Sequence, residues 1–374
     1  MRDEAGRRMS HIADLPALIE ALPNLDRARA TRLFDVSVVT GGLTTPIELR
    51  DWVIQHFGSL EAIEDQQVVR VTDRSSLDGA IFSPLRGRRP QAPAMDSAFR
   101  RLVESTVDDE FCHPETGTPA DSWGRVRGRR TITAANAAKY EGRHGVVIFD
   151  RHDPLAFDAE TIVDLLEVGR AWAERGRAED AEASAYLLIW NGGPRAGGSI
   201  VHGHAQVTLG RRHYPRVERV RRTAAAYEAE TGGAYFADLV AVHRALGLVV
   251  ADDGGVVTLA TLTPVKEREL LIIGQPGMDE RDPAFAGTVA TQLLAYRDVL
   301  GVRAFNLALL RPPIDDRLAN AGGWQVMPPV VHLVDRGDPD LSSSDIGAME
   351  LYAAPVVGAD PFAVADALRQ GLPT

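Results

Sequence analysis

The sequence of 374 residues is poor in cysteine, in lysine and in long apolar runs. The single cysteine, Cys112, excludes an internal disulfide and is typical of a cytoplasmic protein. Lys139 and Lys266 are the only lysines, which leaves few candidates for Schiff-base chemistry. No run approaches the ~18 apolar residues of a membrane span, and residues 1–10 are too charged for a secretory signal. We therefore expect a cytoplasmic protein without a membrane partner.

Positive charge is also in deficit, because 52 acidic residues outnumber 41 basic ones and give a net charge of −11. This balance disfavours nonspecific binding to nucleic acid, so no nucleic-acid partner is expected. Apolar residues make up 45% and charged residues 25% of the chain, as is ordinary for a globular protein. The length predicts two or three packed units.

A pattern of strand, strand, helix, strand, loop and strand occurs twice along the chain. The elements of the first copy are expected at 131–135, 145–149, 160–175, 185–190 and 205–209, and those of the second at 256–262, 269–273, 285–300, 304–310 and 330–334. Runs of strands with single helices indicate an α+β fold with antiparallel sheet and flanking helices, built from two similar halves in tandem.

We divide the chain into three units at residues 80 and 235. Residues 1–80 form an N-terminal extension of mixed structure, with helices predicted at 15–22 and 46–57 and a strand at 68–71. Residues 81–235 form the first half, which begins with an irregular segment rich in proline and arginine, and residues 236–374 form the second half.

The stretch from Asn191 to Leu209 carries the chemistry. Five of its first eight residues are glycine or proline, so its backbone N–H groups can approach an anion closely. His202, His204 and Gln206 follow at alternate positions, which on a strand places all three side chains on one face. We assign His204 as a nucleophile, because neutral imidazole attacks phosphorus well near pH 7, and Gln206 as a donor to a phosphoryl oxygen.

The loop and the alternate histidines of this motif each have a simpler, structural interpretation when taken alone. A glycine-rich loop by itself is usually a turn, and two alternate histidines on a strand are more often solvated or packed in a core. The two features in this order and without a gap favour a functional site.

The stretch resembles the active-site motif of the histidine-triad superfamily, and most closely that of its galactose-1-phosphate uridylyltransferase branch, Asn-x-Gly-x-x-x-Gly-x-Ser-x-x-His-Pro-His-x-Gln. The residues that match are Asn191, Gly193, Gly197, Ser199, His202, His204 and Gln206. The resemblance implies that His204 becomes nucleotidylated and that Asn191, Gly197, Ser199 and Gln206 bind the substrate at its phosphoryl group. Gly203 replaces the proline of the family, which we expect to loosen the strand.

Other matches extend the resemblance to residues 82–370. Arg86 and Arg89 resemble an early Arg-x-x-Arg-Pro, whose arginines lie near the nucleotide, and Asn136 matches an asparagine that holds the nucleoside. Glu350 matches a glutamate that binds sugar hydroxyls. Ala137 and Val356 differ from the residues of the family at positions that would indicate which base and which sugar are bound.

The resemblance also implies a structural zinc ion. Zinc in this family is held by a Cys-x-x-Cys pair, a later histidine and the first histidine of His-x-His. The corresponding residues here are Asp109, Cys112, His152 and His202, all of them acceptable zinc ligands. The family's second metal site is expected to be lost, because residues 324–327 occupy the region of its His-x-His, and His332, alone in that region, is expected to have a structural or exposed role.

The resemblance implies a nucleotidyltransferase that acts on a nucleoside diphosphate-sugar and a sugar phosphate by a ping-pong mechanism. Phosphorolysis of a nucleotide-sugar or a dinucleoside polyphosphate is the main alternative, followed by hydrolysis and by a noncatalytic nucleotide sensor. Because proteins of this branch are often dimers, a homodimer is one arrangement to expect.

Overall fold

The computed structural model describes residues 10–88, 97–341 and 343–372. Its main feature is an antiparallel sheet of nine strands in the order β4-β5-β7-β6-β11-β12-β10-β9-β8. The first half contributes β4 (Thr131–Ala135), β5 (Arg143–Phe149), α7 (Ala159–Glu179), β6 (Ala185–Gly192) and β7 (His204–Gly210). The second half contributes β9 (Val256–Ala260), β10 (Glu267–Ile273), α10 (Pro283–Asp298), β11 (Phe305–Leu310) and β12 (Val330–Asp335), with β8 (Val249–Asp253) at the edge. The predicted α+β fold and the repeated element order are confirmed.

The two halves meet at their equivalent strands, β6 and β11, which pair antiparallel with Asn191 opposite Asn306. The strand order within the first half is therefore repeated in reverse across this junction. One continuous sheet results, and its two faces have different roles.

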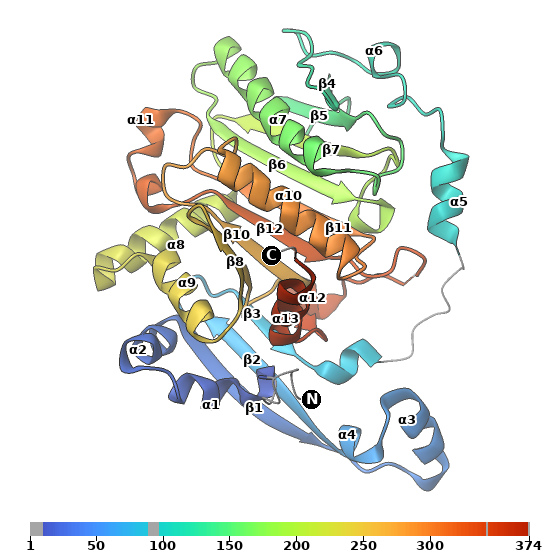
Figure 1. The fold of residues 1–374 in the computed structure, drawn as a ribbon, viewed down its shortest axis with the longest axis vertical. Helices are drawn as coiled ribbons and strands as arrows, with labels where there is room; N and C mark the ends of the chain where they lie inside the picture. Colours follow the sequence, from blue (N-terminus) through green and yellow to red (C-terminus); the bar gives the residue numbers. More distant parts are fainter. Residues whose placement is uncertain (1–9, 89–96, 342, 373–374) are drawn as a thin grey trace.

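Helices α7 and α10 lie side by side on one face of the sheet (Figure 1). The Asp158 side chain accepts a hydrogen bond from the Thr161 N–H and so caps α7. Leu165 and Leu166 are buried in the core between helices and sheet, where each contributes roughly 1.5–3 kcal/mol of hydrophobic stabilisation. Because strand residues alternate between faces, the polar side chains of β7 lie on the opposite face.

The N-terminal extension forms a second sheet in the order β1-β2-β3-β13. Its strands are β1 (Phe34–Gly42), β2 (Asp65–Asp73) and β3 (Gly79–Phe82), and β13 (Val356–Val357) from the end of the chain pairs parallel to β3. The sequence reading missed β1, and the segment expected to be irregular begins with a short 3-10 helix, η3 (Pro84–Arg88). One apolar cluster joins the extension to the second half, with Phe34, Leu239 and Phe362 among its members. The boundaries near residues 80 and 235 stay predictions.

The remaining helices connect these parts or cover them. They are η1 (Ile12–Asp14), α1 (Leu15–Glu20), α2 (Asn24–Leu33), η2 (Ile47–Leu49), α3 (Arg50–Phe57), α4 (Leu60–Glu64), α5 (Ala98–Ser105), α6 (Pro114–Gly117), η4 (Pro194–Ala196), α8 (Pro215–Thr231), α9 (Tyr235–Ala245), α11 (Asp316–Ala319), η5 (Trp324–Val326), α12 (Ala348–Tyr352) and α13 (Pro361–Gly371). None of the helices in the described ranges combines the length and apolar character that crossing a bilayer requires.

Candidate functional site

His204 is the first residue of β7, on the sheet face opposite α7 and α10. Its neighbours along the strand, Ala205 and Val207, point into the core beneath α7, so His204 and Gln206 point the other way. The imidazole is 7% exposed and meets the edge of the Phe111 ring at a centroid distance of 5.1 Å. His204 is thus largely buried against the sheet, beside the Phe111 ring.

The His204 ring has a defined tautomer. Its Nδ1 lies 2.8 Å from the His202 carbonyl oxygen. Since a carbonyl can only accept, Nδ1 carries the proton and Nε2 carries the lone pair. Among the described residues Nε2 has no hydrogen-bond partner, and it is not one of the polar atoms sealed from solvent. Burial lowers the pKa of His204. The free nitrogen is the one that a nucleophile needs.

The glycine loop precedes this strand and contains two residues in the left-handed region. Gly193 has φ +92° and Gly197 has φ +96° on either side of η4, a backbone that side chains rarely permit. At Gly198 a Cβ atom would lie 3.1 Å from the Gly193 carbonyl oxygen. The sequence therefore needs glycine here for the chain to fold back tightly before β7. Ser199 follows in an exposed bend.

Two residues that the sequence reading missed hold this loop in place. The Arg195 guanidinium donates to the carbonyl oxygens of Arg336, Leu341 and Ser343 at 2.6–2.9 Å. Asn306 on β11 donates to the Asn191 side-chain oxygen at 2.7 Å and to the Ala196 carbonyl oxygen at 2.8 Å. A polar residue within the apolar strand Phe305–Leu310 was the available signal for Asn306.

Gln206 lies in a small polar network with residues from the edge of the sheet. Its Oε1 lies 2.8 Å from the Tyr140 hydroxyl and 2.9 Å from His144 Nε2. Asn136 joins the network, with its Nδ2 3.0 Å from the same nitrogen of His144 and its Oδ1 accepting from the Ala138 N–H. The structure thus brings Asn136 close to Gln206, while His144 and Tyr140 were missed.

Gly203 does not loosen the strand, contrary to expectation. Its N–H donates to the His152 carbonyl oxygen at 3.1 Å, and its carbonyl accepts from the Phe149 N–H at 2.9 Å. A Cβ atom at this position would lie 2.8 Å from the Phe149 ring. Proline would remove the first bond and collide with the ring, so glycine fits this chain better than proline does.

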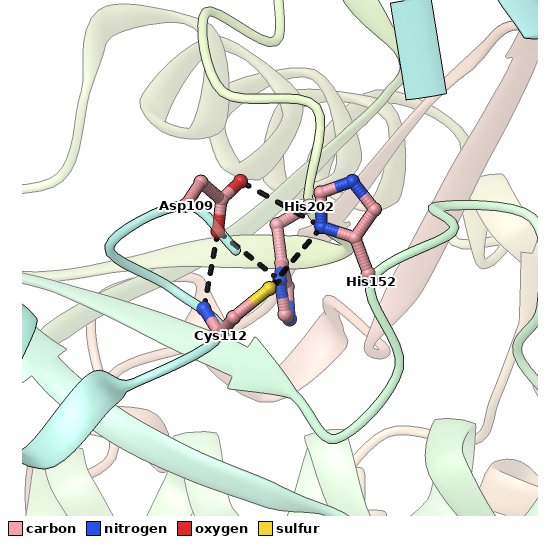
Figure 2. Close-up of side chains that lie close together, drawn as sticks. All are labelled: Asp109, Cys112, His152 and His202. Carbon is pink, nitrogen blue, oxygen red and sulfur yellow. Dashed lines mark hydrogen bonds and ion pairs between the residues drawn. The ribbon is translucent and has the colours of Figure 1, made fainter. Parts of the chain in front are cut away.

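The four predicted metal ligands lie together beside this strand, as Figure 2 shows. The ligand atoms of Asp109, Cys112, His152 and His202 all lie within 4.8 Å of one another. Cys112 Sγ is 3.4 Å from Nδ1 of each histidine. Among the described residues this is the one group of three or more such side chains.

The geometry of the cluster fits a tetrahedral metal ion. His152 Nε2 donates to the Val103 carbonyl at 3.0 Å and His202 Nε2 to the Phe149 carbonyl at 2.8 Å, so both Nδ1 atoms present lone pairs to the centre. Zn–S and Zn–N bonds of about 2.3 and 2.1 Å at a tetrahedral angle separate sulfur and nitrogen by about 3.6 Å, close to the observed 3.4 Å. Asp109 Oδ2 is buried without a hydrogen-bond partner, so its lone pairs are available to a metal ion.

Arg86 and Glu350 lie together at a cleft whose lining includes neither His204 nor Gln206. Both line a cleft of about 360 Å³ together with Lys266, Arg336 and Arg195 of the glycine loop. Burial would raise the pKa of Glu350, but the Gly347 N–H and the charges of Lys266 and Arg86 lower it overall. Arg89 lies outside the described residues.

His332 makes a contact that the sequence does not reveal. Its Nδ1 lies 2.7 Å from Oε1 of Glu269, whose side chain is buried. The two residues come from the adjacent strands β12 and β10. The pair was invisible in the sequence because 63 residues separate its members.

The chain was compared with known proteins. No family model matches it, and no curated protein matches it. Among solved structures, an ADP-glucose phosphorylase from Arabidopsis thaliana with bound ADP-glucose is 18% identical with a TM-score of 0.63, over 82% of this chain and 99% of that one. A GalT-like protein from Arabidopsis thaliana is 18% identical with a TM-score of 0.57, over 71% and 92% of the two chains. A uridylyltransferase is 17% identical with a TM-score of 0.54, over 68% and 88%. The chain therefore has the fold of the galactose-1-phosphate uridylyltransferase-like proteins.

Proposed function

We propose that the chain is a nucleotidyltransferase that transfers the nucleotide of a nucleoside diphosphate-sugar to a sugar phosphate through a covalent intermediate on His204. The observation that carries the proposal is the His204 ring, whose Nδ1–H is bonded to the His202 carbonyl while Nε2 is left free. The glycine loop lies directly before it in a compact turn, in which the N–H groups of Gly193, Ala196, Gly197 and Gly198 donate to carbonyl oxygens within the loop. The resemblance of this stretch to the uridylyltransferase branch supports the same use of His204.

The reaction proceeds in two displacements. His204 Nε2 attacks the α-phosphorus, the P–N bond forms, and the bond from phosphorus to the bridging oxygen breaks, so that the sugar phosphate leaves with the electron pair. A phosphate oxygen of the acceptor then attacks the same phosphorus, the P–N bond breaks, and the lone pair returns to Nε2. The Nδ1–H bond to the carbonyl stabilises the positive charge of the phosphorylated ring. Gln206 donates to a phosphoryl oxygen as charge develops there.

A zinc ion held by Asp109, Cys112, His152 and His202 would have a structural role. When bound, it supplies a rigid crosslink between the segment at 109–112, the segment after β5 and the start of β7. Its effect on the reaction would pass through His202, since the carbonyl of that residue orients the His204 ring. No step of the reaction requires the metal itself.

Phosphorolysis is the second candidate. It is favoured by the similarity to a structure named as an ADP-glucose phosphorylase. The first displacement is then the same, and inorganic phosphate replaces the sugar phosphate as acceptor. The two candidates differ only in which anion resolves the intermediate.

Intact-mass spectrometry after mixing with a panel of nucleotide-sugars tests the proposal. We expect a covalent adduct of one nucleotide, whose mass also identifies the base. His204→Ala should form no adduct and should lower turnover by at least ~10³-fold with its melting temperature retained. Resolution of the adduct by a sugar phosphate, by phosphate or by water then distinguishes transfer, phosphorolysis and hydrolysis. Absence of an adduct with every donor, or an adduct in His204→Ala, contradicts the proposal.

A further inference from the structure

The two ends of the Gln206 side chain have opposite effects on a bound phosphoryl group. The NH₂ end donates to a phosphoryl oxygen, whereas the carbonyl end repels it. Rotation of the amide by half a turn exchanges the ends with little change of shape. The hydrogen-bond partners of Gln206 therefore decide whether this residue assists the reaction or opposes it.

Two donors meet the carbonyl end. The Tyr140 hydroxyl lies 2.8 Å and His144 Nε2 lies 2.9 Å from Gln206 Oε1. The tautomer of His144 follows from its other nitrogen, because Nδ1 faces the backbone N–H of Tyr140 at 3.4 Å and must accept there. Burial lowers the pKa of His144, so the ring is neutral and its one proton is on Nε2.

Each tautomer leaves a mismatch, and the other tautomer leaves two. With the proton on Nε2, that N–H faces the Asn136 NH₂ group, whose nitrogen is 3.0 Å away. With the proton on Nδ1, Nε2 could accept from Asn136 Nδ2 at 3.0 Å. Two N–H groups, those of His144 Nδ1 and Tyr140, would then face each other. Gln206 Oε1 would also lose one of its two donors.

We infer that His144, assisted by Tyr140, is a positioning residue that holds the Gln206 amide with its NH₂ group directed to the phosphoryl group at His204. The inference rests on the proposed function. His144 itself touches no reacting atom, and it acts by occupying the end of the amide that would oppose the reaction.

The second half has a side-chain hydrogen bond at the position equivalent to the His144–Gln206 bond, between the different residues His332 and Glu269. Gln206 is opposite Val146 and Ile189 in the sheet, just as His332 is opposite Leu271 and Ala308. Each bonds to the residue two places before its neighbour on the adjacent strand, which is His144 in the first half and Glu269 in the second.

The two halves differ at the nucleophile. His204 is opposite Ile148, and the equivalent position opposite Ile273 is occupied by Val330. The second half, with Val330 at the position of the nucleophile, has the histidine–carboxylate pair His332–Glu269. The first half, with His204 at that position, has the amide of Gln206 bonded to His144. This contrast supports a role for the His144–Gln206 bond in the reaction rather than in the fold.

A double-mutant cycle tests the inference. The rate of adduct formation in a single turnover is measured for His144→Phe, Gln206→Ala and the double variant. We expect His144→Phe to slow the step about 10- to 100-fold, with little change in the donor concentration for half-maximal rate, and to cause no further slowing in the Gln206→Ala background. His144→Gln, which restores an N–H at a similar reach, should recover most of the rate. The matched control His332→Gln should leave it unchanged.

A second measurement does not depend on activity. Long-range ¹H–¹⁵N correlation of the histidine rings reports the tautomer of His144, which should be the one with the proton on Nε2. Additive effects of His144→Phe and Gln206→Ala, or the tautomer with the proton on Nδ1, overturn the inference. If wild-type protein forms no adduct, the proposed function fails, and the tautomer still decides whether Gln206 is held as described.

Discussion

At the scale of single residues, the site depends on which atom of each imidazole is bonded to the backbone. His152, His202 and His204 each donate one ring N–H to a main-chain carbonyl. The two metal-cluster histidines use Nε2 and so present Nδ1, whereas His204 uses Nδ1 and so presents Nε2. Local backbone geometry therefore makes His202 and His204, two residues apart, present opposite ring nitrogens.

Removal of the thiolate tests the metal cluster. Cys112→Ser should lose the bound metal, detected by elemental mass spectrometry as less than one equivalent per chain after dialysis. Without the crosslink at His202, adduct formation should fall about 10- to 100-fold. His113→Ala is the matched control, because His113 is adjacent but contacts Asp108 instead of the cluster. Full metal content in Cys112→Ser would show that the cluster does not bind metal.

The residue between the two histidines gives a stability prediction. Gly203→Pro should lower the free energy of unfolding by about 1–3 kcal/mol, since it removes the bond to His152 and crowds Phe149. Gly287→Ala is the control, because α10 leaves open space around Gly287, and it should add about 0.5–1 kcal/mol. Urea denaturation measures both. A proline variant as stable as wild type would mean that the strand tolerates the family's residue.

At the scale of elements, one buried histidine joins α9 to the second half of the sheet. His243 Nδ1 donates to the Leu239 carbonyl at 2.8 Å, and Nε2 accepts from the Leu262 N–H at 3.2 Å. Both ring nitrogens are thus used by the neutral form. Burial lowers the pKa of His243 to about 4.

This pKa predicts how stability depends on pH. In the unfolded chain His243 takes up a proton as the pH falls below its ordinary pKa of about 6.5. In the folded protein it stays neutral until the pH approaches its lowered pKa of about 4. The contribution of neutral His243 to the free energy of unfolding should therefore be fully present above pH 6.5. It should decrease as the pH drops towards 4, by up to ~1.4 kcal/mol per pH unit. Urea midpoints between pH 4 and 8 check this. His243→Gln should flatten the slope relative to wild type, and an unchanged slope would contradict the assignment.

The elements that the sequence predicted are those with a strong repeating pattern. Helices α7 and α10 were expected at 160–175 and 285–300 and occur at Ala159–Glu179 and Pro283–Asp298, because each buries a regular apolar stripe on the sheet. Helices α8 and α9 between the two copies were not predicted. Polar residues on these two helices weaken the helical periodicity of their apolar residues. The helices pack against residues of the extension and of the second half that lie far away in the sequence.

At the scale of the whole molecule, the second half supports the glycine loop of the first. Strand β11 places Asn306 against Asn191 and Ala196, and Arg336 donates to the Asn306 side-chain oxygen. The loop thus depends on a residue 110 positions or more away in the chain. The second half thus contributes directly to the proposed site of the first.

Asn306→Ala tests this dependence. It should slow adduct formation at least ~10-fold through misplacement of the loop, and it should cost about 1–2 kcal/mol of unfolding free energy. Hydrogen exchange at residues 193–198 should accelerate. Asn320→Ala, which removes a surface bond to the Asp316 carbonyl, is the control. An unchanged rate of adduct formation and unchanged hydrogen exchange would show that the loop keeps its conformation without Asn306.

The sequence by itself determined the glycine loop and the strand that carries His204 and Gln206 on one face, because these are local features that propensity and strand geometry dictate. It also indicated the four residues of the metal cluster through the resemblance of their spacing to a known family. Only the tertiary structure decided which partners those residues have: Tyr140 and His144 for Gln206, Asn306 for Asn191, and Glu269 for His332. Such partners depend on the register between strands that are distant in the chain, and residue patterns within each strand do not fix that register.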